Sequence, residues 1–146
     1  MKSILFSLIV CCSLLMIGCS DDENATFLTI EEFVELNNLS PTTTPSGLQF
    51  IIQDVGDEPR PTLNSSITFT YDGYFLGGET FDSQNEFTFP ILAGLIPGWQ
   101  EGLQLIGEGG SITLLIPSNL AYGPQGFGPI PGNTDIGFDV QLISVQ

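Results

Sequence analysis

Apolar and polar residues alternate along four stretches that follow residue 47. These stretches are residues 48–54, 66–76, 111–117 and 135–145. In the second stretch the two alternating sets are Ile67, Phe69 and Tyr71, and Thr68, Thr70 and Asp72. A period of two is typical of strands that have one face in a core and the other in solvent. The pattern therefore predicts four strands in a β-rich domain.

Two shorter strands are predicted between the second and third of these. Gly77-Gly78 is a two-residue hairpin signal at the end of 66–76, after which residues 80–82 return along the sheet. Residues 84–86 are predicted to form a short loop before a further strand at 87–89. A long loop follows at 119–133, with four Gly and three Pro, and loops of that length are usually functional or disordered.

Residues 95–103 have a different period and predict one short helix. Ile96, Trp99 and Leu103 recur at helical spacing, and Pro97 suits the first helical position. Gly98 and Gly102 are poor helix formers, so we expect another element to pack very close to that face. The sequence therefore indicates a sheet wrapped around this helix, with Trp99 as the floor of a concave site.

A second short helix is predicted at residues 29–39, before the strands begin. Thr29 and Glu32 have the spacing of a capping box, and Asn37-Asn38 end the helix. Residues 40–46 contain two prolines and are predicted to be a linker. We therefore expect a domain at 47–146 and a separate N-terminal part at 19–46.

Residues 1–18 are predicted to be a signal peptide, with Lys2 before an apolar run too short to span a membrane. The run ends in Met16-Ile17-Gly18-Cys19, which resembles the lipobox of bacterial lipoproteins and implies lipidation of Cys19. An ordinary secretory signal is the alternative. Residues 20–24 are an acidic tether, which resembles an outer-membrane sorting stretch or is a plain linker. These features predict lipid anchoring in the bacterial cell envelope, at the outer membrane on its periplasmic face or the cell surface.

Charge narrows the functional classes. The chain has 17 acidic residues against two basic ones, a formal net charge of −15, and no histidine. Nucleic acid is a poor partner for such a chain because phosphate binding needs Lys and Arg. A missing histidine removes the commonest general base and metal ligand, and the carboxylates do not cluster at ligand spacing. We therefore expect no metal, no cofactor and no nucleophile–base pair.

What remains is a set of aromatic and aliphatic side chains. They are Tyr71, Phe81, Phe87, Leu95, Ile96, Trp99, Tyr122 and Phe138. On composition alone, these residues are the core of a small β domain. Their order in the chain favours a second interpretation, in which they line a binding pocket.

Seven motifs carry this second interpretation. They are Tyr71-Asp72-Gly73, Phe81-Asp82-Ser83, Phe87-Thr88-Phe89-Pro90, residues 96–103, Ala121-Tyr122-Gly123, Ile130-Pro131 and Phe138-Asp139-Val140-Gln141-Leu142. In this order they resemble the FKBP-type peptidyl-prolyl cis–trans isomerases over residues 45–146. The resemblance implies an α+β fold, in which a curled antiparallel sheet of five to six strands wraps around one short helix.

The resemblance also implies a site for proline-containing polypeptide clients, without a cofactor, and possible inhibition by macrolides of the rapamycin type. Its implied catalytic residues are Tyr71, Asp82 and Tyr122. Its implied substrate-binding residues are Phe81, Phe87, Leu95, Ile96, Trp99, Ile130 and Phe138. Trp99 is expected to form the floor, and the Ile96 N–H and the Tyr122 hydroxyl to point at substrate carbonyls.

Three positions depart from the family pattern. Residues 83–86 contain no Arg to pair with Asp82, and Gly132 replaces a second proline. Phe127 stands where relatives often carry a His or a small residue, and it is placed to enlarge the apolar rim or to cover the pocket. The favoured function is peptidyl-prolyl isomerisation. The alternatives are a non-catalytic module of the same fold that binds proline-containing or unfolded segments, and a structural lipoprotein with an aromatic core.

Overall fold

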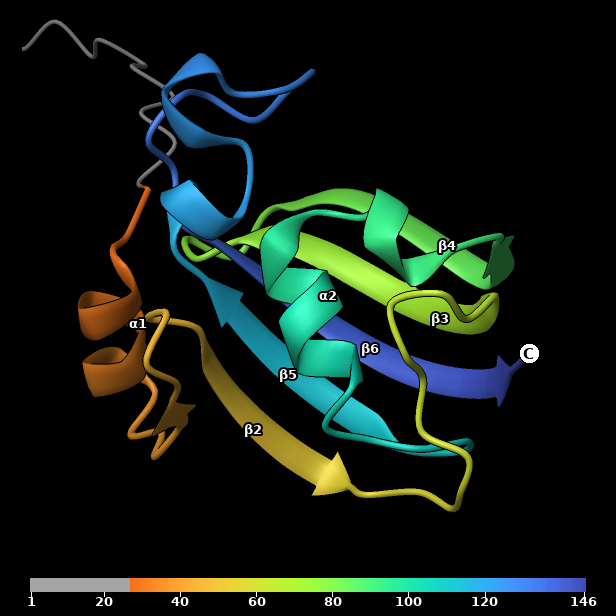
Figure 1. Ribbon diagram of the computed structural model, residues 1–146. Coiled ribbons are helices and arrows are strands. Elements are labelled where there is room, and N and C mark those ends of the chain that lie inside the picture. Colours follow the sequence, from red (N-terminus) through yellow and green to blue (C-terminus); the bar gives the residue numbers. More distant parts are fainter. Residues whose placement is uncertain (1–26) are drawn as a thin grey trace, which may run out of the picture.

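The computed structural model describes residues 27–146, so the predicted signal peptide, Cys19 and the acidic tether lie outside the described residues. Within this range, six strands form one antiparallel sheet in the order β1-β2-β5-β6-β3-β4. The strands are β1 (Thr42–Thr43), β2 (Gln49–Asp54), β3 (Ile67–Phe75), β4 (Thr80–Phe89), β5 (Ser111–Ile116) and β6 (Ile136–Val145). The predicted α+β fold is confirmed (Figure 1).

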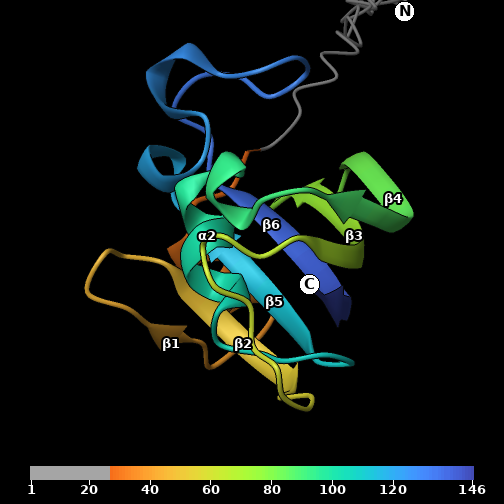
Figure 2. The same cartoon turned by 45° about the vertical axis from the view of Figure 1, so that its right-hand side comes forward.

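Helix α2 (Pro97–Leu103) crosses β5 on the concave side of the sheet (Figures 1 and 2). Pro97 occupies the first turn, where its missing N–H leaves no bond unmade. A Cβ on Gly98 would lie 2.5 Å from Ile116 Cγ2, and one on Gly102 would collide with Leu114 Cδ2. The predicted close approach to this helix is therefore confirmed, and both glycines permit it.

Helix α1 (Ile30–Leu36) packs on the opposite face of the sheet. Its buried residue Ile30 contacts Leu115, whereas Leu114, the preceding residue of β5, belongs to the core beneath α2. Successive side chains of a strand point to opposite faces, so the two helices lie on different sides of β5. The Asp135 carboxylate accepts from the Ile30 N–H at the start of α1 (3.4 Å) and from the Ser118 N–H after β5 (2.9 Å). These two hydrogen bonds connect the start of the helix to the segments next to the sheet.

Both ends of α1 follow from its sequence. The predicted capping box is present, with the Thr29 hydroxyl accepting from the Glu32 N–H and the Glu32 carboxylate accepting from the Thr29 N–H. The helix is shorter than the predicted 29–39 because Asn38 adopts a positive φ of 50°. This turns the chain so that the Leu39 N–H donates to the Val34 carbonyl, as in a Schellman motif.

Strand β4 corrects the prediction of two short strands separated by a loop at 84–86. The strand is continuous, and its pairing with β3 shifts between Phe69↔Phe87 and Tyr71↔Gln84. Glu86 has a positive φ of 50°, and its N–H donates to the Thr70 hydroxyl. A β-bulge therefore replaces the predicted loop.

Two further differences are local. Part of the predicted linker at 40–46 forms β1, which pairs with β2 through Thr42↔Phe50 and Thr43↔Gln49. A 3₁₀ helix at Leu92–Gly94 precedes α2, a second at Ser118–Leu120 overlaps the start of the predicted 119–133 loop, and a third at Gly123–Gln125 lies within that loop. Among residues 27–146, every helix is too short or too polar to cross a membrane.

Candidate functional site

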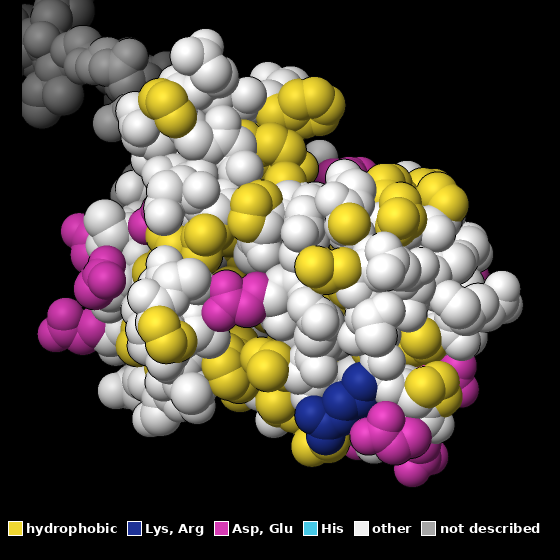
Figure 3. Space-filling model, in the orientation of Figure 1, with side chains coloured by type: hydrophobic (Ala, Val, Ile, Leu, Met, Phe, Trp, Pro, Cys, Tyr) yellow, Lys and Arg dark blue, Asp and Glu magenta, His cyan; other side chains and the backbone are white. Residues whose placement is uncertain are grey.

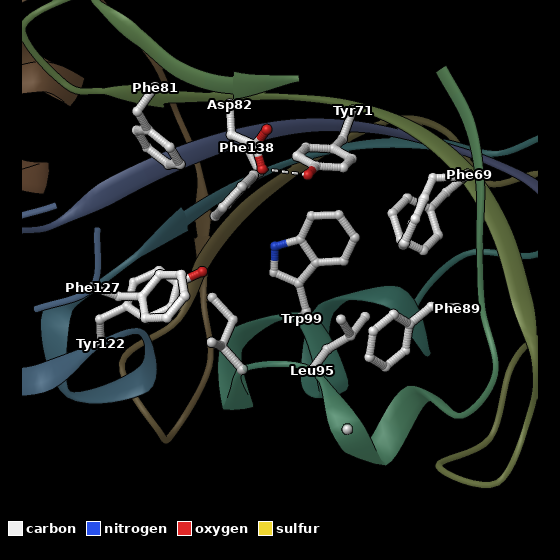
Figure 4. Close-up of a pocket in the computed structure, with 13 residues that line it drawn as sticks. Phe69, Tyr71, Phe81, Asp82, Phe89, Leu95, Trp99, Tyr122, Phe127 and Phe138 are labelled. Atoms are coloured by element: carbon white, nitrogen blue, oxygen red, sulfur yellow. Dashed lines mark hydrogen bonds between the residues drawn. The ribbon is translucent and has the colours of Figure 1, made fainter. Parts of the chain in front are cut away.

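A cavity of about 390 Å³ opens between α2 and the strands β3, β4 and β6 (Figure 4). It is lined by Phe69, Tyr71, Phe81, Asp82, Phe87, Phe89, Gly94, Leu95, Ile96, Trp99, Tyr122, Phe127 and Phe138. Nine of the ten residues predicted for the site are in this lining, and the exception is Ile130. The cavity is predominantly aromatic, and its oxygen-bearing side chains are Tyr71, Asp82 and Tyr122.

Trp99 forms the floor of the cavity, at the centre of Figure 4. The residue is only 4% exposed, and three other rings meet its ring at steep angles. The centroid distances are 5.0 Å to Phe69, 5.3 Å to Tyr71 and 5.1 Å to Phe138, with interplanar angles of 62°, 90° and 83°. Edge-to-face contacts of this kind fix ring orientation. The floor is therefore apolar and firmly packed.

The wall beside Asp82 depends on a glycine in β3. The rings of Phe81 and Phe138 meet edge to face at 5.6 Å and 88°. A Cβ on Gly73 would lie 2.6 Å from Phe138 Cε1 and 2.8 Å from Phe81 Cε2. Any larger side chain would therefore push this wall of the cavity out of place.

Asp82 is bound to Tyr71, whose hydroxyl donates to the Asp82 Oδ2 at 2.5 Å (Figure 4). Burial, followed by the hydrogen bond to Asp82, raises the pKa of Tyr71 well above its usual range. In the described part of the chain, the ion pair that forms joins Arg60 to Glu58 and does not involve Asp82. Asp82 therefore brings a carboxylate to the cavity without a basic side chain beside it.

Tyr122 enters the cavity from the 119–133 loop, with the Phe127 ring stacked on it at 5.3 Å and 15°. Its hydroxyl points toward the middle of the cavity in Figure 4 and has no hydrogen-bond partner among residues 27–146. Burial, and secondly the negative charge of Asp82, raise the pKa of Tyr122. The phenol therefore stays protonated and able to donate to a ligand.

Ile96 is the N-cap of α2 and has an extended backbone, with φ −60° and ψ 151°. Its carbonyl accepts from the Trp99 and Gln100 N–H groups, whereas its own N–H has no acceptor within the described residues. The Gln100 side-chain amide donates to the Leu95 carbonyl at 2.6 Å and to the Ala93 carbonyl at 3.1 Å. This bracing holds the segment that presents the free Ile96 N–H.

Ile130 does not line the cavity. It is 4% exposed and packs in the main core, while its backbone pairs with that of Phe127. The Phe127 ring, on the other side of this backbone pair, lines the cavity instead.

Four lining residues were not predicted as site residues: Phe69, Phe89, Gly94 and Phe127. Phe69 and Phe89 had a signal in the sequence, because each is two residues from a predicted site residue on the same strand. Phe127 was singled out as a departure from the family pattern but was not assigned to the site. Gly94 belongs to a 3₁₀ helix that the pattern of residues does not indicate.

The lining restricts the chemistry. Among the described residues, no three His, Cys, Asp or Glu side chains gather at metal-binding distance. The cavity offers rings that bury an apolar ligand, a tyrosine hydroxyl, a backbone N–H and one carboxylate. This set suits binding and orienting a small apolar ring with carbonyl groups on either side, rather than covalent catalysis.

Comparison with known proteins agrees with this geometry. Residues 58–143 match the family model described as FKBP-type peptidyl-prolyl cis-trans isomerase. A probable FKBP-type peptidyl-prolyl cis-trans isomerase FkpA of Neisseria meningitidis serogroup B is 45% identical over 108 residues, which are 70% of this chain and 39% of the relative. The outer membrane protein MIP of Legionella longbeachae is 36% identical over 122 residues, 80% of this chain and 52% of the relative.

The fold is likewise similar to a solved structure. The crystal structure of FkpA from Escherichia coli superposes with a TM-score of 0.74 at 34% identity, covering 80% of this chain and 57% of that chain. The chain spans about 39% and 52% of the length of the two curated relatives above.

Proposed function

Since the chain belongs to the FKBP-type peptidyl-prolyl cis–trans isomerase family, we propose that it accelerates rotation about X–Pro bonds in folding client polypeptides. The observation that carries this proposal is the aromatic cavity with Trp99 as its floor and the Tyr122 hydroxyl and Ile96 N–H as unpaired hydrogen-bond donors in its lining. The proline ring is placed over Trp99. Burying its three methylenes contributes about 2 kcal/mol at ~0.8 kcal/mol each, which suits weak, reversible binding.

An X–Pro bond rotates slowly because twisting it breaks amide resonance, over a barrier of ~18–20 kcal/mol. Rotation makes or breaks no covalent bond, so the enzyme only has to bind the twisted amide more tightly than the planar one. The twisted amide has a smaller dipole and is therefore less disfavoured in an apolar cavity. A ring held over Trp99 while the preceding carbonyl turns would meet this requirement.

Three polar groups have separate roles in this proposal. The Tyr122 hydroxyl and the Ile96 N–H donate to client carbonyls on either side of the proline and hold the chain in place. The Asp82 carboxylate lies beside the rotating amide, so its negative charge is close to the carbonyl that precedes the proline. Tyr71 fixes that carboxylate through their 2.5 Å hydrogen bond.

The decisive experiment is a cis–trans assay on a short X–Pro peptide with purified residues 20–146, alongside Trp99→Leu and Asp82→Ala. We expect the wild type to accelerate isomerisation and both variants to lose activity while circular dichroism shows an intact fold. Ser83→Ala is the matched control, because Ser83 is an exposed neighbour of Asp82 outside the cavity. A folded wild type that binds the peptide without accelerating its isomerisation would instead identify a non-catalytic binding module.

The same cavity is proposed to bind macrolides of the rapamycin type. Such ligands present an apolar ring flanked by carbonyls, which suits a cavity with an aromatic floor and hydrogen-bond donors in its lining. Trp99 is the only tryptophan of the chain, so its fluorescence reports occupancy directly. Saturable quenching by the macrolide, together with competitive inhibition of the peptide assay, is the expected result. Absence of both would exclude this ligand class.

We further propose lipid anchoring through Cys19 in the bacterial cell envelope, at the outer membrane. The lipobox-like Met16-Ile17-Gly18-Cys19 supports this, as does the similarity to a relative named outer membrane protein MIP. Labelled palmitate should be incorporated into the wild type and not into Cys19→Ser. Separation of inner and outer membranes then tests the location, and recovery of unlabelled wild type in the soluble periplasmic fraction would contradict the proposal.

A further inference from the structure

Phe127 is a large apolar side chain exposed at the mouth of the cavity. It is 68% exposed, yet it lines the cavity and its ring lies flat on that of Tyr122. We propose that Phe127 is a positioning residue, whose ring fixes Tyr122 so that the Tyr122 hydroxyl points at a client carbonyl. This inference rests on the proposed function, because it concerns the group that holds the client.

The backbone, rather than a flexible side chain, sets the position of Phe127. Its N–H donates to the Ile130 carbonyl and the Ile130 N–H donates to the Phe127 carbonyl, both at 2.9 Å. Gly126 and Gly128 flank it with φ of 66° and 54°, a region that favours glycine. Ile130 anchors this turn in the core at 4% exposure. The Phe127 ring is thus placed over Tyr122 by a hydrogen-bonded turn that Ile130 ties to the core.

The two cavity tyrosines differ in what orients them. Asp82 accepts from the Tyr71 hydroxyl and so fixes its direction. The Tyr122 hydroxyl has no such partner among residues 27–146, so its ring must be oriented by packing. The stacked Phe127 ring, 15° from parallel, covers the Tyr122 face and restricts rotation of the side chain. Without Phe127, that face would be exposed and the hydroxyl free to turn away.

A double-mutant cycle tests the inference, with peptide affinity measured by Trp99 fluorescence in an X–Pro tetrapeptide titration. Tyr122→Phe removes the hydroxyl, and Phe127→Ala removes its support. Losing one hydrogen bond of ordinary strength weakens binding by about threefold to tenfold. We expect each single variant to show a loss in this range and the double variant to lose no more than the larger single loss. Fully additive losses would mean that Phe127 acts independently of the hydroxyl, which overturns the inference.

Two further variants and one spectroscopic measurement complete the test. Phe127→Tyr keeps the ring and should restore wild-type affinity, while Leu36→Ala, equally exposed at 69% but on α1, should leave it unchanged. Side-chain couplings in NMR give the Tyr122 χ1 rotamer, expected to be single in the wild type and averaged in Phe127→Ala. This reading needs no peptide. If the wild type binds no X–Pro peptide, the proposed function fails, while a Tyr122 rotamer unchanged in Phe127→Ala separately overturns the positioning role.

Discussion

Gly73 controls how closely two walls of the cavity approach each other. An added Cβ would lie 2.6 Å from Phe138 and 2.8 Å from Phe81, closer than side chains tolerate. We predict that Gly73→Ala destabilises the fold by about 1–3 kcal/mol, the usual cost of overpacking, and lowers kcat/KM because both rings move. Urea unfolding and the peptide assay measure the two effects. Retention of full activity would show that this wall does not position the proline.

The two cavity tyrosines determine how the stability of the fold should change at alkaline pH. Burial raises the pKa of both Tyr71 and Tyr122, so each phenol keeps its proton beyond the ordinary value of about 10. The folded pKa lies above the unfolded one. Each tyrosine's contribution to stability is therefore complete below about pH 10 and is lost as pH rises through the folded pKa.

Activity should follow the same groups. Because Tyr122 donates only while protonated, we expect kcat/KM to stay level from neutral pH up to about pH 10. The measurement is the peptide assay across that range at constant ionic strength. The chain has no histidine to add a transition near neutrality. A fall in activity centred well below pH 10 that Tyr122→Phe abolishes would contradict this prediction.

The sequence was sufficient to predict which residues belong to the site where a side chain is characteristic in itself, such as a lone tryptophan or a tyrosine near an aspartate. Trp99, Tyr71 and Asp82 were predicted for the site, and the structure brings them together. Ile130 was also predicted, but it lies in the core because the Phe127–Ile130 backbone pair directs Phe127 to the mouth instead. That outcome depends on how a glycine-rich turn folds, and the identities of the residues do not fix it.

At the level of elements, the sequence predicted the features that depend on neighbouring residues and missed those that depend on contacts between distant parts of the chain. The capping box of α1 and the Pro97 start of α2 depend on neighbours within one helical turn, and both were predicted. Strand β1 forms only because Thr42 meets Phe50 across a turn. The bulge in β4 likewise depends on pairing with β3, since Glu86 donates to Thr70. Neither contact has a local pattern to indicate it.

Helix α1 offers a test of whether the two faces of the sheet act independently. Ile30 is 3% exposed and packs with Leu76 and Leu115 on the face opposite α2. We predict that Ile30→Ala lowers the free energy of unfolding by about 2–4 kcal/mol, as large-to-small changes in a core do. Activity measured at low temperature, where the protein remains folded, should be unchanged.

Leu36→Ala is the control for this prediction, because Leu36 is on the same helix and 69% exposed. Its effect on stability should stay within about 0.5 kcal/mol. If Ile30→Ala lowers kcat/KM while the protein is folded, then α1 is coupled to the cavity. Such coupling would have a physical route, since Phe27 at the start of the described chain packs on Phe75, and Phe75 packs on the cavity residue Phe81.

The molecule as a whole is strongly acidic. The sequence has 17 acidic residues and two basic ones, and within residues 27–146 Arg60 is the only basic side chain. On the face shown in Figure 3, acidic side chains lie along the left border, near the middle and at the lower right beside the one basic side chain, and hydrophobic side chains are scattered between them. A long-range negative field of this kind attracts positively charged ligands and speeds their encounter.

The net charge of the client peptide should therefore change kcat/KM even where the charged residues of the peptide do not contact the cavity. We predict that an X–Pro peptide flanked by lysines has a higher kcat/KM than one flanked by glutamates. The difference should narrow as salt is raised from 0.01 to 1 M, because the screening length falls from about 30 Å to about 3 Å. If the field of the whole molecule is responsible, Asp82→Asn will reduce the preference only in part, since most of the charge remains. A preference that is insensitive to salt would instead place its origin in short-range contacts with Asp82 and the surrounding rings.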